Sequence, residues 1–116
     1  MTGLKIGLVG PCAAGKSTLR EALRARGFHA RHIAQEHSYA QDMWKRVGRP
    51  DVLIFLDVSF AESTRRRQTS WELGDYEEEQ ARLRHAREHA DLYITTDGMA
   101  PEEVLEAVLD FLQPPP

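Results

Sequence analysis

The chain has 116 residues, 41% of them hydrophobic and 28% charged, which is the size and composition of one globular domain. Its formal net charge of −3 argues against a broad nucleic-acid surface, which usually carries an excess of basic residues. A single cysteine excludes an intramolecular disulfide, and there is neither a signal peptide nor an apolar run of about 20 residues, so we expect a cytoplasmic protein with no membrane contact.

One domain is predicted over residues 1–113, followed by a flexible proline tail at 114–116. Within the domain, short apolar runs predict strands, and longer segments rich in helix formers predict helices. In chain order these are strand Leu4–Val9, helix Ser17–Arg26, strand Phe28–Ala34, helix Tyr39–Arg46, strand Asp51–Val58, helix Phe60–Thr69, a break at Ser70–Gly74, helix Asp75–His89, strand Asp91–Thr96, and helix Glu102–Leu112 with Pro101 at its first position.

The alternation of strands and helices predicts an α/β fold with three layers, in which helices cover both faces of a parallel sheet of about four strands. The run Asp51–Val58 is the most apolar of the chain, as expected for a strand covered on both faces. Ligands in such sheets bind at the carboxyl ends of the strands. Residues that directly follow a strand are therefore the first candidates for a site.

The segment Gly10–Ser17 (GPCAAGKS) matches the Walker A pattern G-x-x-x-x-G-K-[ST] at every fixed position, between a predicted strand and a predicted helix. Small residues let successive backbone N–H groups point at one anion, and the helix adds its positive end. The alternative is a glycine-rich turn that only connects the two elements. The motif predicts a P-loop of the P-loop NTPase fold, which binds ATP through Gly10, Pro11, Cys12, Ala13, Ala14, Gly15, Lys16, Ser17 and Thr18.

Three residues of the loop have distinct predicted roles. Lys16 supplies a mobile positive charge to the β- and γ-phosphates and is a predicted catalytic residue. Ser17 offers a hydroxyl to Mg²⁺, and Thr18 can hydrogen-bond the α-phosphate. The sequence therefore predicts Mg²⁺ together with ATP as the cofactors.

Two acidic residues follow predicted strands and are candidates for the metal or the reacting group. Asp57 ends the most apolar strand, as in a Walker B motif, and is predicted to assist the metal with Ser17; alternatively it caps the next helix. Glu36 follows the second predicted strand. If that strand lies directly beside the first, Glu36 comes near Mg²⁺, where it could hold a metal-bound water or act as a base. Neighbouring His37 could help to bind an acceptor. The alternative for both residues is a polar loop that caps the next helix through Ser38.

Three consecutive arginines, Arg65–Arg67, are predicted to contact phosphates. Arg66 is predicted to act in catalysis by neutralising charge during transfer, and Arg65 and Arg67 to bind the nucleotide. Because consecutive helical residues point in different directions, one or two of them are expected to reach the phosphates. The alternative is that the arginines form a solvated face paired with Glu77–Glu79. For the second group of arginines, Arg82, Arg84 and Arg87, this alternative is preferred.

Nearly the whole chain resembles the P-loop kinases of the nucleoside-monophosphate-kinase type, which include adenylate, shikimate and gluconate kinases. Beside the P-loop, Val52–Asp57 followed by Arg65–Arg67 is similar to the strand that leads into their arginine-bearing lid. Gly74–Arg87 looks like the rest of a lid and its return helix, and Asp91–Gly98 like their last strand and adenine-side loop. The resemblance implies phosphoryl transfer from Mg-ATP to a small-molecule acceptor, although one strand–helix unit and the inserted acceptor region of that family have no counterpart here.

A second function of a different class is a nucleotide-binding module without efficient catalysis. In this alternative, bound ATP orders the arginine segment and so regulates association with another protein or with a second copy of the chain. A minimal domain with exposed sheet edges has a physical reason to form such a homo-oligomer, because unpaired edge strands are ready to pair.

Overall fold

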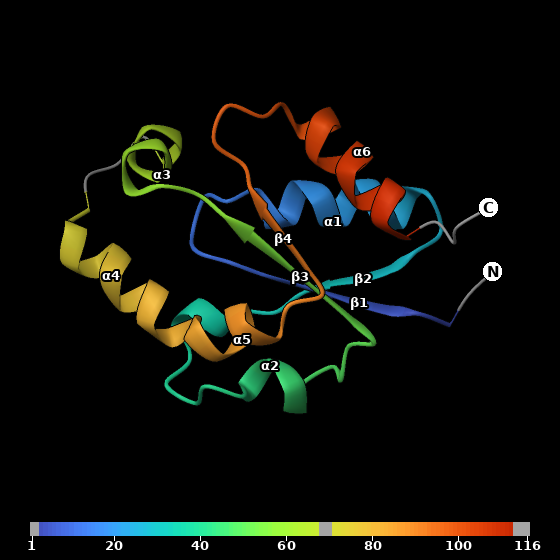
Figure 1. Ribbon diagram of the computed structural model, residues 1–116, viewed down its shortest axis with the longest axis horizontal. Coiled ribbons are helices and arrows are strands. Elements are labelled where there is room, and N and C mark those ends of the chain that lie inside the picture. The colour runs from blue at the N-terminus through green and yellow to red at the C-terminus, as the bar shows by residue number, and fades with distance from the viewer. Residues whose placement is uncertain (1–2, 68–70, 113–116) are drawn as a thin grey trace.

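A computed structural model describes residues 3–67 and 71–112, and in these residues it contains four strands, six α-helices and one 3₁₀ helix. In chain order the elements are β1 Lys5–Val9, α1 Lys16–Ala25, β2 His29–His32, the 3₁₀ helix η1 Gln35–His37, α2 Met43–Arg46, β3 Val52–Asp57, α3 Phe60–Arg67, α4 Leu73–Arg82, α5 Arg84–His89, β4 Leu92–Thr95 and α6 Pro101–Leu112 (Figure 1). The proline tail and the start of the predicted break at Ser70 lie outside the described residues. No helix in the described part of the chain is long and apolar enough to cross a bilayer.

The four strands form one parallel sheet in the order β2-β1-β3-β4. Both the α/β class and the four-stranded parallel sheet are therefore confirmed. In β1, Gly7 pairs with Arg31 of β2 on one side and with Leu53 of β3 on the other. Because all strands run the same way, the segments that follow them meet at one edge of the sheet.

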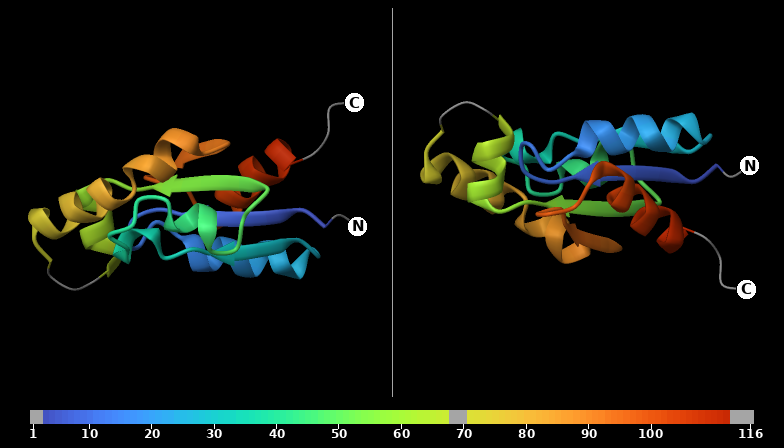
Figure 2. Two further views of the ribbon diagram at one scale, coloured as in Figure 1. Left: turned by 90° about the horizontal axis from the view of Figure 1, so that it is seen from below. Right: turned by 90° about the horizontal axis from the view of Figure 1, so that it is seen from above.

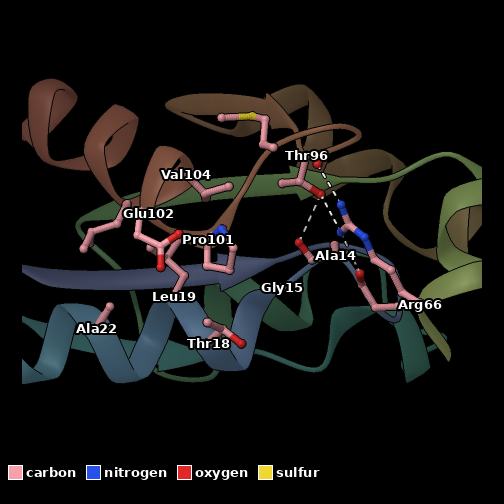
Figure 3. A pocket seen from close by; sticks show the side chains of 13 residues that line it. Ala14, Gly15, Thr18, Leu19, Ala22, Arg66, Thr96, Pro101, Glu102 and Val104 are labelled. Atoms are coloured by element: carbon pink, nitrogen blue, oxygen red, sulfur yellow. Dashed lines mark hydrogen bonds between the residues drawn. The ribbon is translucent and has the colours of Figure 1, made fainter.

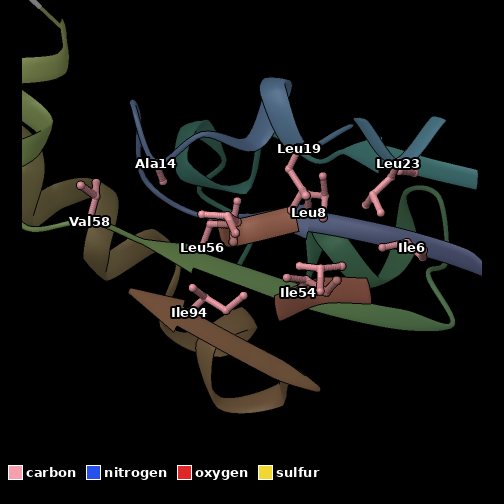
Figure 4. Close-up of a cluster of buried hydrophobic side chains, with 12 residues drawn as sticks. Ile6, Leu8, Ala14, Leu19, Leu23, Ile54, Leu56, Val58 and Ile94 are labelled. Atoms are coloured by element: carbon pink, nitrogen blue, oxygen red, sulfur yellow. The ribbon is translucent and has the colours of Figure 1, made fainter. Parts of the chain in front are cut away.

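Helices cover both faces of the sheet, as the three-layer expectation required (Figures 1 and 2). On one face, α1 and α6 pack against the sheet through a core cluster (Figure 4) whose buried members are Ile6, Leu8, Ala14, Leu19, Leu23, Ala30, Ile54, Leu56, Val58, Ile94, Val104 and Val108. On the other face, α2 and α5 contribute to a second cluster formed by Val9, Ile33, Trp44, Leu53, Phe55, Leu83 and Ala86.

Strand β3 is covered by helices on both faces, which explains why its residues 52–56 are all apolar. Ile54 and Leu56 belong to the α1 and α6 core, and the alternating Leu53 and Phe55 belong to the α2 and α5 core. All four side chains are at most 2% exposed. Successive side chains of a strand point to opposite faces, so a strand covered twice shows no polar alternation.

The single helix predicted at Asp75–His89 is wrong in two respects. Helix α4 begins earlier, at Leu73, where Glu72 and Asp75 form a reciprocal capping box. The segment is then divided into α4 and α5 around Leu83, which is fully buried in the second core. Because α5 packs on the sheet whereas α4 extends toward α3 beyond the carboxyl ends of the strands, one straight helix cannot serve both positions (Figure 1).

Candidate functional site

The turn between β1 and α1, residues 10–15, adopts a backbone that few residue types can take. Gly10, Ala13 and Gly15 have φ angles of 152°, 68° and 100°. A Cβ on Gly10 would lie 1.9 Å from the carbonyl oxygen of Leu56 on the neighbouring strand. Helix α1 starts at Lys16, so the positive end of its dipole adjoins the turn. The backbone thus requires glycine at the first position of the motif.

Lys16 and Glu36 form a buried ion pair at this turn. Lys16 Nζ donates to the carbonyl oxygens of Gly10 and Pro11, the latter at 3.0 Å, and to Glu36 Oε2 at 3.0 Å. The side chains of Lys16 and Glu36 are only 5% and 3% exposed. Glu36 Oε1 is buried and has no hydrogen-bond partner among the described residues. Two residues predicted to act in catalysis are therefore brought into contact.

The position of Glu36 follows from the pairing of β2 directly with β1, which the sequence analysis considered for this strand. The segment after β2 is held by Gln35, which is fully buried. Gln35 Nε2 donates to the carbonyl oxygens of Ala40 and Arg82 at 2.8 and 3.2 Å, and Gln35 Oε1 accepts from the Trp44 amide at 2.8 Å. These bonds fix η1 against neighbouring segments, and Glu36 with it.

Two histidines lie near the Glu36 carboxylate. The Nε2 atoms of His32 and His37 are 3.8 and 3.7 Å from Glu36 Oε2. Burial, and then the charge of Lys16, lower the pKa of His32 below its ordinary value. The neutral form of His32 is therefore favoured beside the Lys16–Glu36 pair.

Arg66 is the member of the arginine triplet that reaches the turn. Its Nη1 donates to the Ala13 carbonyl oxygen at 3.1 Å and to Thr96 Oγ1 at 3.0 Å, and its Nη2 donates to the Thr96 carbonyl oxygen at 2.7 Å. Thr96 Oγ1 in turn lies 3.2 Å from the Ala14 carbonyl oxygen (Figure 3). Arg66 and Thr96 thus join α3 and the end of β4 to the turn.

The other two arginines of the triplet have different partners, as expected for consecutive residues of a helix. The Arg65 side chain is 74% exposed and pairs with Glu62. The Arg67 guanidinium lies over the Trp71 ring, 4.3 Å from its centroid. In the described residues neither contacts the turn, so their predicted role in binding the nucleotide stays a prediction.

Glu62 accepts hydrogen bonds from both Arg65 and Arg66, and these bonds lower its pKa to about 2. The interaction of Glu62 with these two arginines stabilises the fold above pH 4.5, the ordinary pKa of a glutamate. This contribution is lost as the pH falls from 4.5 to 2 and the carboxylate is protonated. We expect an NMR titration of the Glu62 carboxyl carbon to show a midpoint near 2. In the double variant Arg65→Ala/Arg66→Ala the midpoint should return toward 4.5, and an unchanged midpoint would contradict the pairing.

Asp57, predicted to assist the metal, has other partners. Asp57 Oδ1 accepts from the Val58 amide at 2.9 Å and from Gln80 Nε2 at 3.0 Å, and Oδ2 accepts from the Tyr93 hydroxyl. Burial and this hydrogen bond raise the pKa of Tyr93. Asp57 does not line either cavity at the turn. Its role as a metal ligand stays a prediction to which this geometry adds no support.

Two cavities adjoin the turn, one on each side. The first, the α6-side cavity, has a volume of about 520 Å³ and is lined by Ala13, Ala14, Gly15, Thr18, Leu19, Ala22, Arg66, Thr96, Met99, Pro101, Glu102, Val104 and Leu105 (Figure 3). The second, the η1-side cavity, has a volume of about 370 Å³ and is lined by Cys12, Ala13, Ala14, Gly15, Lys16, Ser17, Thr18, His32, Glu36 and His37. Both cavities are lined by Ala13, Ala14 and Gly15 of the turn and by Thr18 of α1.

Glu79 and Thr96 are polar site residues that the sequence analysis did not single out. Glu79 is 6% exposed, whereas a solvated face was considered for Glu77–Glu79. Its Oε1 accepts from the Cys12 amide at 3.0 Å, and the Cys12 thiol donates to its Oε2 at 3.0 Å. Glu79 lies four residues, about one helical turn, before the apolar Leu83, and residues at this spacing share one face of a helix. This spacing is a sequence signal that Glu79 faces inward. Thr96 follows a strand directly, so the strand-end rule could have found it.

Burial raises the pKa of the Cys12 thiol to about 11, and the hydrogen bond and charge of Glu79 act in the same direction. The thiol is therefore protonated at neutral pH and serves as a hydrogen-bond donor.

The chain matches no protein-family model and no curated protein. That the turn is a P-loop stays a prediction from its sequence motif.

Proposed function

We propose that this protein binds Mg-ATP along the Gly10–Thr18 segment and transfers the γ-phosphoryl group to a small hydroxyl-bearing acceptor. One observation carries the proposal: Lys16 and Arg66 come from different elements and both contact the turn, and Glu36 from a third element pairs with Lys16, between two cavities. A turn that only connected a strand to a helix would have no need of two cations and a buried carboxylate.

The α6-side cavity suits the base and ribose. Its walls between α1 and α6 are largely apolar, with Leu19, Val104 and Leu105 among them, and flat heterocycles bind well between such surfaces (Figure 3). Arg66 and Thr96 stand at its inner end, next to the turn. A nucleotide with its base against α6 would therefore place its phosphates along the turn.

Phosphate binding would use the backbone amides of the turn, the end of the α1 dipole and two cations. Lys16 is held near the turn by the Gly10 and Pro11 carbonyls, and Arg66 is held by Ala13 and Thr96. A triphosphate offers these cations stronger acceptors than carbonyl oxygens. In this proposal both cations reach the triphosphate by movement of their side chains.

The residues present fit Mg²⁺. Ser17 offers an exposed hydroxyl, and Glu36 offers a buried carboxylate oxygen without a partner among the described residues; both line the η1-side cavity. Mg²⁺ prefers such oxygen donors and keeps several of its waters. Ser17 would contact the ion, and Glu36 would hold one of its waters. When bound, the ion supplies charge neutralisation between the β- and γ-phosphates.

In the proposed transfer, the bond between the γ-phosphorus and the β–γ bridging oxygen breaks, and the acceptor oxygen forms the new bond. The products are ADP, a phosphate ester and a proton, which passes to the nearby Glu36 carboxylate. Lys16 and Arg66 stabilise the charge that develops on the phosphoryl oxygens. Such catalysis consists of positioning and electrostatics, with no covalent enzyme intermediate.

Calorimetry with Mg-ATP, Mg-ADP and adenosine tests the binding half of the proposal. We expect Mg-ATP to bind, Mg-ADP to bind more weakly and adenosine to give no detectable heat. Absence of Mg-ATP binding would overturn the proposal.

For the transfer half, ³¹P NMR should detect ADP when pools of sugars, hydroxy acids or nucleosides are added. Binding without any turnover would favour the nucleotide-regulated association module, which light scattering with and without Mg-ATP would then reveal.

The two neighbouring arginines offer a matched pair of variants. We expect Arg66→Ala to weaken Mg-ATP binding about tenfold, the value of one lost charge-assisted contact, because Arg66 alone of the two reaches the turn. Arg65→Ala removes the same charge from the same helix but should change affinity less than about twofold, since exposed charges act weakly. Equal effects from calorimetry would contradict a specific role for Arg66.

A further inference from the structure

Cys12, His37 and Glu79 bring three metal-ligating atoms together, from the turn, from η1 and from α4. These atoms all lie within 4.8 Å of one another. Cys12 Sγ is 3.0 Å from Glu79 Oε2 and 3.9 Å from His37 Nε2. We propose that these three side chains, the Cys12–His37–Glu79 site, bind a transition-metal dication, with Zn²⁺ as the best match.

The distances suit a tetrahedral ion. With bonds of about 2.3 Å to sulfur and about 2.0–2.1 Å to nitrogen or oxygen, neighbouring ligand atoms around Zn²⁺ lie about 3.5 Å apart. The two separations at Cys12 Sγ, 3.0 and 3.9 Å, lie on either side of this value. On binding, the ion displaces the proton of the Cys12 thiol, which is released to the solvent. The resulting thiolate, the imidazole and the carboxylate together favour Zn²⁺ over Mg²⁺ or Ca²⁺, which prefer oxygen ligands.

The surroundings supply support for the ligands and a path for the ion. Glu79 is buried, and its second oxygen accepts from the Cys12 amide at 3.0 Å, which fixes the carboxylate. The His37 side chain is 60% exposed, so an ion can enter from its side. Glu36 Oε2 lies 3.7 Å from His37 Nε2, and the buried Oε1 of Glu36 lacks a partner in the described part of the chain. Glu36 is therefore available to a fourth ligand, such as a metal-bound water.

An ion at this site would affect nucleotide binding at the turn. Cys12 belongs to the turn, so a bound ion would fix the turn to α4 through Glu79. The ion would also draw on Glu36, the partner of Lys16. We therefore expect bound Zn²⁺ to weaken Mg-ATP binding. This competition rests on the proposed function, whereas the metal site itself does not.

Cobalt spectroscopy tests the site directly, because Co²⁺ bound by a thiolate gives a charge-transfer band in the near ultraviolet. The chain contains one cysteine, so any such band reports Cys12. We expect Co²⁺ added to the full chain without nucleotide to produce the band with one ion per chain, and Zn²⁺ to remove it. Absence of the band at saturating Co²⁺ would overturn the proposal.

Substitutions then identify the other ligands. Cys12→Ser should abolish the band, and His37→Asn and Glu79→Gln should each weaken Zn²⁺ at least about tenfold. The controls His89→Asn and Glu78→Gln change exposed residues of the same types and should leave affinity unchanged. If Glu79→Gln does not fold, Glu79→Asp keeps the charge and should still weaken the metal by shortening the side chain. Unchanged Zn²⁺ affinity in the folded His37 and Glu79 variants would overturn the site.

The competition needs a control because ATP itself binds Zn²⁺. One equivalent of Zn²⁺ should weaken Mg-ATP binding at least about tenfold in the natural chain and have much less effect in Cys12→Ser, where only the ATP-bound Zn²⁺ remains. Equal effects in both proteins would overturn the competition. If neither protein binds nucleotide, the proposed function fails, while the cobalt spectrum still decides the metal site.

Discussion

The Lys16→Met variant is expected to lose Mg-ATP binding and, in addition, about 3–5 kcal/mol of folding free energy. The loss of binding follows because Lys16, held by the Gly10 and Pro11 carbonyl oxygens of the turn, is the cation assigned to the β- and γ-phosphates. The loss of stability follows because Glu36, 3% exposed, would remain as a buried carboxylate without its charge partner. Calorimetry measures the first effect, and denaturant unfolding measures the second.

A double variant separates these two effects. In Lys16→Met/Glu36→Gln no charge is left unpaired, so most of the lost stability should return, while binding stays absent because the cation is still missing. Glu36→Gln alone should keep Mg-ATP binding and lower turnover, because the amide cannot take up the proton. Recovery of binding in the double variant would show that Lys16→Met acted only through misfolding and would contradict the proposed role of Lys16.

Gly10→Ala should be the most damaging substitution of a single small residue in the chain. A Cβ at this position would lie 1.9 Å from the Leu56 carbonyl oxygen, which is backbone of the central strand β3 and cannot move aside without shifting the sheet. The φ angle of 152° adds strain for any L-residue. We expect a loss of about 4 kcal/mol or more in denaturant unfolding, at the upper end for point substitutions.

Substitutions of two other glycines serve as controls for the Gly10→Ala variant. Gly15 has a φ angle of 100° but open space around a Cβ, so Gly15→Ala should cost only the backbone strain, about 1–3 kcal/mol. Gly74 lies in α4 with neither a clash nor a left-handed backbone, and Gly74→Ala should stabilise by roughly 0.5–1 kcal/mol. If Gly10→Ala costs no more than Gly15→Ala, the close approach of β1 and β3 at this point is wrong.

The sequence by itself determined the α/β class, the number of strands and the place of the turn, because these depend on local patterns. The apolar run of β3 and the helix-forming residues of α1 each specify their own element with little help from distant contacts. The Walker A spacing likewise predicted a turn with glycines where the backbone needs them, at Gly10 and Gly15.

Only the tertiary structure decided which polar side chains meet at that turn. The triplet Arg65–Arg67 has the same residue type three times, and the direction of α3 brought Arg66 alone to Ala13 and Thr96. Likewise, Glu77–Glu79 is uniform in sequence, and the rotation of α4 buried Glu79 against Cys12. Local patterns specify elements, but the choice among equivalent side chains depends on how helices are oriented when their apolar faces pack, and that orientation is set by residues distant in the chain.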